Sequence, residues 1–157
     1  MKGVVVPPDL LGTVRRFAAE AYPEECCGFL LAAPPTVGSE SERRIVDALP
    51  SPNRARQNRA HRFVIPPEEL RSAERWASTR DLVVAGFYHS HPDHPARPSA
   101  FDQEHAWPWY VYLIAASRAA GPGPVGAFEL DADRREFREI ELRSEATGPS
   151  PLPSGAR

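Results

Sequence analysis

Two histidines separated by one residue are the strongest chemical signal in this sequence. His89 and His91 follow an apolar run, residues 82–88, which predicts a buried strand. Because side chains alternate along a strand, both imidazoles are expected to leave the same face. Two neutral imidazoles on one face form a natural binding site for a transition metal.

A carboxylate further along the chain could complete this site. Ser99-Ala-Phe-Asp102 follows a proline-rich loop and predicts the start of a short helix. Asp102 could therefore return an oxygen atom to the point where His89 and His91 meet. Two histidines and one carboxylate leave a fourth tetrahedral position open, as in a catalytic rather than a structural zinc site.

The same residues also have purely structural interpretations. His-x-His pairs occur in ordinary exposed loops, and Ser99-x-x-Asp102 is a capping-box pattern. The complete spacing favours the metal site: His-x-His, seven residues, Ser, two residues, Asp. This string resembles the JAMM motif of the MPN+ metalloproteases, which cleave amide bonds at the C-terminus of ubiquitin and ubiquitin-like proteins.

A glutamate near the N-terminus matches the other half of that motif. Amide hydrolysis at a metal needs a group that accepts a proton from water and protonates the departing amine. In JAMM enzymes this group is a glutamate that precedes x-x-Gly at the start of a buried strand, and Glu25-Cys26-Cys27-Gly28 has this pattern. The resemblance implies that Glu25 is the base and acid and that Ser99 stabilises the oxyanion. It also implies that Zn²⁺ is bound by His89, His91 and Asp102.

Three further residues compete for a place in the site. Glu24 is expected to be the solvated end of the strand. His94 lies in the loop 93–98 and outside the spacing, and whether this loop covers the site is left open. His105 follows Asp102 by three residues and could share its helix face, but the family does not use this position as a ligand.

Composition and cysteine usage limit the class of protein. The chain has 157 residues, 41% of them hydrophobic and 25% charged, as expected of one globular domain. A net charge of −2 argues against a nucleic acid or a membrane surface as partner. Cys26 and Cys27 are adjacent, so a disulfide between them is unfavourable and free thiols are expected. No signal-peptide core or membrane span is recognisable, so a cytoplasmic protein is predicted.

The remaining elements predict an α/β architecture. Helices are expected after Pro7 and after Pro66, where prolines and acids occupy the first turn. About seven strands are expected, including one at 62–65 and a hairpin that follows a Gly-Pro-Gly-Pro turn at 121–124. The resemblance implies a single-domain MPN fold over residues 1–142: a mixed curved sheet with flanking helices, similar to cytidine deaminase. Residues 143–157 are expected to be a disordered tail.

The resemblance also implies a function. It predicts a zinc-dependent peptidase or isopeptidase acting at the C-terminal Gly-Gly of a ubiquitin-like or sulfur-carrier protein, with release of an amino acid such as cysteine. The alternative is a non-catalytic MPN-type binding module for such a protein. An arginine-rich loop with Arg54, Arg56 and Arg59 is either solvated or in contact with an acidic partner. The oligomeric state is not determined, and a homodimer is one option.

Overall fold

A single mixed sheet organises the fold, and the computed structural model describes residues 3–35, 42–133 and 135–145. The eight strands of these residues have the order β7-β6-β5-β4-β2-β3-β1-β8. They are β1 (Gly3–Val5), β2 (Cys27–Ala32), β3 (Glu42–Ser51), β4 (Val83–Pro92), β5 (Val111–Arg118), β6 (Gly121–Asp131), β7 (Glu136–Glu139) and β8 (Glu141–Arg143). The helices of this part of the chain are α1 (Pro8–Ala21), α2 (Pro67–Ser78) and α3 (Ala100–His105).

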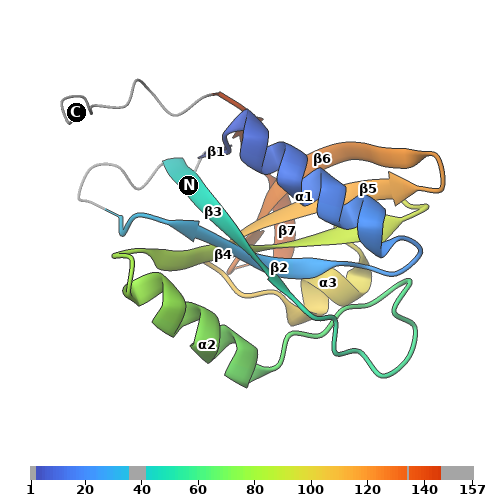
Figure 1. Cartoon of the computed structure of the whole chain (residues 1–157), viewed down its shortest axis with the longest axis horizontal. Coiled ribbons are helices and arrows are strands. Elements are labelled where there is room, and N and C mark those ends of the chain that lie inside the picture. The colour runs from blue at the N-terminus through green and yellow to red at the C-terminus, as the bar shows by residue number, and fades with distance from the viewer. Residues whose placement is uncertain (1–2, 36–41, 134, 146–157) are drawn as a thin grey trace.

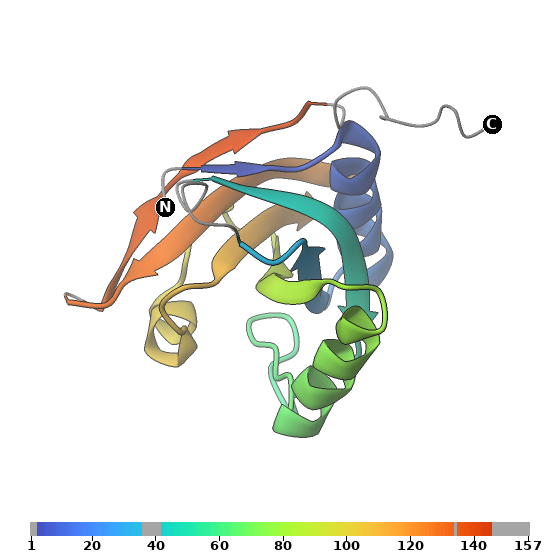
Figure 2. The same ribbon diagram turned by 90° about the vertical axis from the view of Figure 1, so that its left-hand side faces the viewer.

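The sheet is strongly curved and contains both strand directions. β4 runs parallel to β5, and β1 runs parallel to both β3 and β8, whereas the other pairs are antiparallel. Figure 2 shows the curvature, which brings β8 at one edge into contact with β6 near the other. The predicted mixed curved sheet with flanking helices is therefore confirmed.

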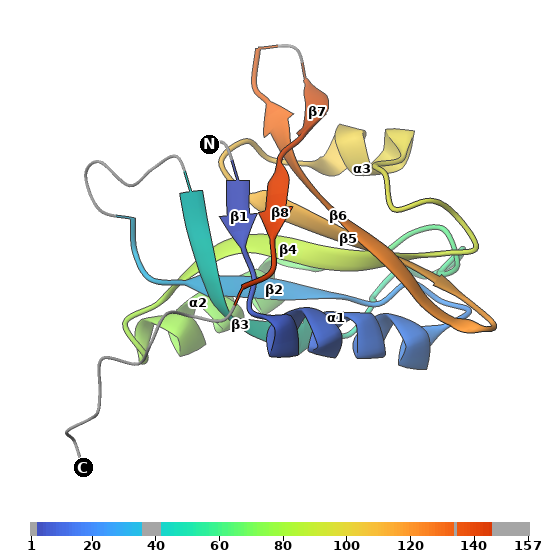
Figure 3. The same cartoon turned by 90° about the horizontal axis from the view of Figure 1, so that it is seen from above.

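Two apolar clusters fill the two sides of this sheet. On one side, α1 buries Val14 and Ala18 against Leu30 of β2 and Tyr88 of β4. Figure 1 shows α1 crossing in front of the sheet, and Figure 3 shows α3 on the opposite side. This second side contains the other cluster, to which α2 contributes Ala73 and Ala77. Because β4 is buried on both faces, its side chains alternate between the two clusters.

This alternation decides where the two histidines point. Tyr88 belongs to the cluster under α1, and Phe87 belongs to the cluster on the side of α2. β4 continues without interruption to Pro92, so it is longer than the apolar run that predicts it. His89 and His91 have the same parity as Phe87 and leave the strand on the side of α2 and α3.

Two predicted elements are wrong. Residues 62–65 form no strand but an extended loop, because the side chain of Asn53 takes the place of a neighbouring strand. Its Oδ1 atom accepts a hydrogen bond from the Val64 N–H (3.2 Å). The turn predicted at 121–124 lies earlier: β6 already begins at Gly121, whose φ of +135° lets the hairpin reverse at residues 119–120.

The predicted domain boundary at 142 falls within β8 and stays a prediction. Arg143 still belongs to β8, where it pairs with Val5 and forms an ion pair with Glu42. Residues 146–157, most of the predicted tail, lie outside the described part of the structure. Among the helices that are described, none has the length and apolarity needed to cross a membrane.

The close approach of β4 to β5 yields a test of this architecture. A Cβ atom at Gly86 would lie 2.1 Å from the carbonyl oxygen of Val111, a backbone atom that cannot move aside without separating the strands. We expect Gly86→Ala to destabilise the protein by about 3 kcal/mol. Gly12→Ala is the control, because nothing lies within 4 Å of its Cβ position in α1. This change is expected to stabilise the protein by about 0.5–1 kcal/mol. Urea unfolding of both variants measures the difference, and equal stabilities would contradict the packing.

Candidate metal and catalytic site

Three ligand atoms from β4 and α3 meet at one buried point. The Nε2 atoms of His89 and His91 lie 3.2 Å apart. The Oδ2 atom of Asp102 lies 3.1 Å from the first and 3.0 Å from the second. All three residues are less than 9% exposed. The structure thus brings together the three predicted ligands, which are separated by up to 13 positions in the sequence.

A hydrogen bond on the far side of the His91 ring decides whether its Nε2 atom presents a hydrogen or a lone pair to the site. Its Nδ1 atom lies 2.9 Å from the carbonyl oxygen of Pro95. A carbonyl oxygen can only accept, so Nδ1 carries the hydrogen, and in the neutral ring Nε2 presents a lone pair. That lone pair faces the carboxylate oxygen of Asp102. Two electron-pair donors at 3.0 Å repel each other unless a proton or a metal ion lies between them.

The dimensions and the charges of this cluster fit a metal ion. Ligands about 2.0–2.1 Å from a tetrahedral ion are about 3.3 Å apart, close to the three separations observed. Burial lowers the pKa of His89, although Asp102 opposes this effect, so its neutral, ligating form is favoured. Burial alone would raise the pKa of Asp102, but His89, His91 and the backbone of Ser99 outweigh it and lower the pKa well below its usual range. The three donors therefore fit a metal site.

The start of α3 holds Asp102 in position. Ser99 caps the helix: its Oγ atom accepts a hydrogen bond from the Asp102 N–H at 3.0 Å. The Ser99 N–H donates in return to Oδ2 of Asp102 at 2.9 Å. The capping box and the metal site are therefore one arrangement, since the oxygen that closes the box also faces both histidines. Ser99 is exposed, and its hydroxyl hydrogen remains available for an external acceptor.

Glu25 lies beside this cluster because β2 pairs with β4. Cys27 is opposite His89 in the antiparallel register, and the Ser90 N–H donates to the Cys26 carbonyl at 3.1 Å. Continued in this register, Glu25 is opposite His91 and has the same parity as Cys27. Its side chain is only 4% exposed, and its Oε1 atom has no hydrogen-bond partner among the described residues.

A buried carboxyl group without partners holds its proton. Burial, together with the negative charge of Asp102, raises the pKa of Glu25 to about 9. A cation held by His89, His91 and Asp102 would counteract both effects by favouring the carboxylate. The ionisation of Glu25 is therefore coupled to occupation of the metal site.

Several contacts that support the site were not predicted. The Phe63 ring stacks on His89 with centroids 4.5 Å apart. The loop 93–98 is tied down by its Pro95 carbonyl and by Tyr22, whose hydroxyl donates to Asp93 at 2.8 Å. Short apolar runs such as the one around Phe63 do indicate burial, but the partner of an aromatic ring is not visible in a sequence. A backbone carbonyl acceptor cannot be recognised from residue types, because every residue has one.

The competing residues lie outside the cluster. His94 is exposed, and the centroid of its ring lies 5.4 Å from that of His61. His105 is exposed and is held by the Phe101 carbonyl at 2.9 Å. Glu24 is exposed as expected. Trp107 and Trp109 are 66% and 49% exposed.

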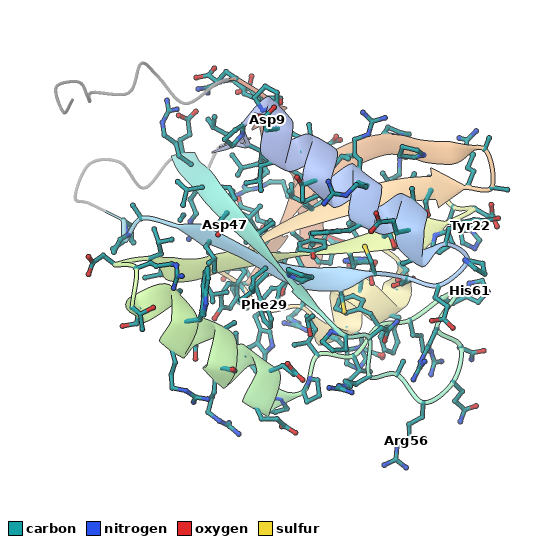
Figure 4. The ribbon with its side chains drawn as sticks, viewed as in Figure 1. Asp9, Tyr22, Phe29, Asp47, Arg56 and His61 are labelled. Carbon is teal, nitrogen blue, oxygen red and sulfur yellow. The ribbon has the colours of Figure 1, made fainter. Side chains whose placement is uncertain are left out.

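The arginine-rich loop has partly internal contacts. Arg54 forms an ion pair with Glu69 at 3.2 Å, and Arg59 donates to the Ala55 carbonyl at 2.7 Å. Figure 4 shows Arg56 projecting away from the fold and Tyr22 and His61 at the same end of the molecule. Of these three arginines, only Arg56 extends freely into solvent.

Metal content tests the cluster directly. We expect wild-type protein to bind about one divalent metal ion per chain and His89→Ala to lose it, because two remaining donors bind far more weakly. His94→Ala and His105→Ala are the controls and should retain the metal. Mass spectrometry of the purified variants provides the measurement. Metal loss in a control but not in His89→Ala would show that the ligands are assigned wrongly.

The raised pKa of Glu25 makes the metal-free protein sensitive to pH. Unfolded Glu25 releases its proton near pH 4.5, whereas the folded protein retains it up to about pH 9. Between these values the unfolded chain binds fewer protons, so its free energy falls relative to the folded state as pH rises. We expect chelator-treated wild type to lose stability from pH 5 to pH 9 relative to Glu25→Gln, which has no proton to release. Urea unfolding at several pH values measures this, and parallel curves would refute the burial of a protonated Glu25.

Comparison with known proteins agrees with this geometry. Residues 7–131 match the family described as prokaryotic homologues of the JAB domain. A protein of Haloferax volcanii named desampylase is 37% identical over 138 residues, which cover 87% of this chain and 90% of that protein. A solution structure of a Salinibacter ruber protein is 38% identical, with a TM-score of 0.68 over 96% of this chain and 93% of that one. A JAB1/MPN domain protein from Archaeoglobus fulgidus shares the fold, at 19% identity and a TM-score of 0.53 over 92% of this chain and 99% of that one. The chain therefore belongs to the JAB/MPN family, among its prokaryotic homologues, and is a JAMM-type hydrolase.

Proposed function

We propose that this chain is a Zn²⁺-dependent peptidase that hydrolyses the amide bond after the C-terminal Gly-Gly of a ubiquitin-like protein, sulfur carriers included. One observation carries the proposal: three buried metal-binding donors and a buried, unpaired glutamate lie on the same side of β2 and β4. The matches to the JAB domain and to the desampylase of H. volcanii support the class of substrate.

His89, His91 and Asp102 would hold the zinc ion. Two imidazoles and one carboxylate are a donor set that zinc accepts in hydrolases. Bound there, Zn²⁺ would act as a Lewis acid that polarises the scissile carbonyl and lowers the pKa of water. The Pro95 carbonyl would keep His91 in its ligating tautomer.

Glu25 would move the proton. Water supplies the oxygen for the new C–O bond, and Glu25 accepts one of its hydrogens as that bond forms. When the C–N bond breaks, Glu25 returns the proton to the departing amine. The second hydrogen of the water remains on the new Gly-Gly carboxyl group, which then ionises and releases it, so the products near neutral pH are a carboxylate and a protonated amine. A carboxyl group whose pKa lies between its normal value and about 9 can perform both transfers near neutral pH.

Ser99 would stabilise the negative oxygen that develops on the carbonyl. Its Oγ atom accepts from the Asp102 N–H, which orients the hydroxyl and leaves its hydrogen to donate. Because the same helix turn holds Asp102, this donor is in a fixed position relative to the metal ligands. Removal of the hydroxyl would therefore affect both the oxyanion and the helix cap. The predicted homodimer and cytoplasmic location stay predictions.

A matched pair of glutamates tests the proton transfer. We expect Glu25→Gln to lower kcat by at least about 10²–10⁴-fold while zinc stays bound, because glutamine cannot accept a proton. Glu24→Gln, the exposed neighbour, should retain activity. The assay measures release of a reporter amine fused behind the Gly-Gly terminus of a ubiquitin-like carrier. An active, zinc-loaded Glu25→Gln variant would eliminate Glu25 as the base.

A further inference from the structure

An apolar pocket of about 260 Å³ opens beside the metal ligands. Its walls come from the loop around residue 64, from β4 and β5, and from α3 with the segment that follows it. The apolar side chains in its lining include Phe63, Val64, Phe87, Phe101, Trp107 and Tyr112. His89 and Asp102 form the end of the pocket that touches the metal site.

We propose that this pocket binds the side chain of the residue that leaves as the amine, and that this side chain is aliphatic or aromatic. The inference rests on the proposed function and specifies its substrate. The acyl side of the scissile bond ends in two glycines, which have no side chain to fill such a space. Because the pocket begins at His89 and Asp102, the first side chain that can reach it belongs to the residue directly after the scissile bond.

The volume of the pocket indicates the size of that side chain. A cavity of about 150 Å³ in a protein core holds a benzene molecule. A pocket of 260 Å³ therefore accommodates a leucine, methionine or phenylalanine side chain and leaves a cysteine side chain with much of the space unfilled. Cysteine, expected from the resemblance, is consequently not the side chain that fits best.

The chemistry of the walls determines the polarity of that side chain. At the inner end, Oδ2 of Asp102 is already engaged, since it faces both histidines and accepts from Ser99. His105, at the rim, has its Nδ1 atom bonded to the Phe101 carbonyl. A charged side chain would lose hydration among the apolar side chains that form most of this pocket. An apolar side chain would replace water along Phe63, Phe101 and Trp107.

Two valines with similar exposure provide a variant and its control. Val64 lines the pocket and is 42% exposed, and Val46 on β3 is 45% exposed and does not line it. Glutamate at position 64 places a negative charge in the pocket wall. The backbone bonds of Val64 to Asn53 and Arg54 do not involve its side chain and are preserved.

The experiment measures kcat/KM for carrier fusions Gly-Gly-X, where X is Gly, Cys, Leu, Phe, Glu or Arg. Wild type should cleave the Leu and Phe fusions at least about tenfold faster than the Gly, Glu and Arg fusions. Val64→Glu should reverse or abolish the preference for Leu over Arg, whereas Val46→Glu should leave that ratio unchanged. Equal rates for all fusions, or the same ratio in Val64→Glu as in wild type, would overturn the pocket assignment.

A binding measurement separates this inference from the proposed function. Leucinamide and glycinamide are titrated into metal-free protein while the indole N–H resonance of Trp107 is followed by NMR, with Trp107→Phe to assign the signal. Leucinamide alone should shift this resonance, and Val64→Glu should weaken the response. If no fusion is cleaved but leucinamide binds, the peptidase proposal fails and the pocket stands. If leucinamide does not bind while fusions are cleaved regardless of X, the pocket fails and the peptidase proposal stands.

Discussion

The structure depends on one electrostatic constraint: three electron-pair donors are held about 3 Å apart in a buried position. Unless a proton or a metal ion lies between them, the lone pair of His91 and the carboxylate of Asp102 repel each other at 3.0 Å. The fold maintains this contact through a β-strand, a helix cap and a backbone carbonyl. The fold thus holds three donors in an arrangement that a metal ion would stabilise.

The pairing of the strands places a buried carboxyl group beside these three donors. The antiparallel pairing of β2 with β4 places Glu25 next to the cluster, where burial deprives its carboxyl group of water. The same negative charge of Asp102 that would bind a cation raises the pKa of Glu25 in the absence of one. The charge of Asp102 thus favours a bound cation, and it makes the ionisation of Glu25 depend on whether that cation is present.

Each ligand is held by contacts behind it. The ring of Phe63 covers one face of His89, the Pro95 carbonyl fixes the tautomer of His91, and Ser99 orients Asp102. Phe63 also forms part of the apolar pocket, so the wall that positions a ligand is the wall that a substrate side chain would touch. Phe63 would thus both position His89 and contact the substrate side chain. The loop around residue 64 therefore contributes to the site together with the strands.

The sequence by itself determined the type of fold and predicted the candidate metal ligands and the candidate base. The spacing from His89 to Asp102 and the sequence Glu25-x-x-Gly28 resemble the JAMM motif, and this resemblance implies the roles of these residues. The helices are predictable from proline and acidic residues in their first turns, because residue type is a local property. The apolar residues at 62–65 are typical of a strand, but Val64 is bonded to the side chain of Asn53 and to the Arg54 N–H, ten or more positions away, instead of to a neighbouring strand. The tertiary structure alone decided that the capping oxygen is also the metal-facing oxygen, that Pro95 sets the state of His91, and that an apolar pocket adjoins the ligands. These features depend on distances between segments far apart in the chain, and such distances follow from packing rather than from local residue patterns.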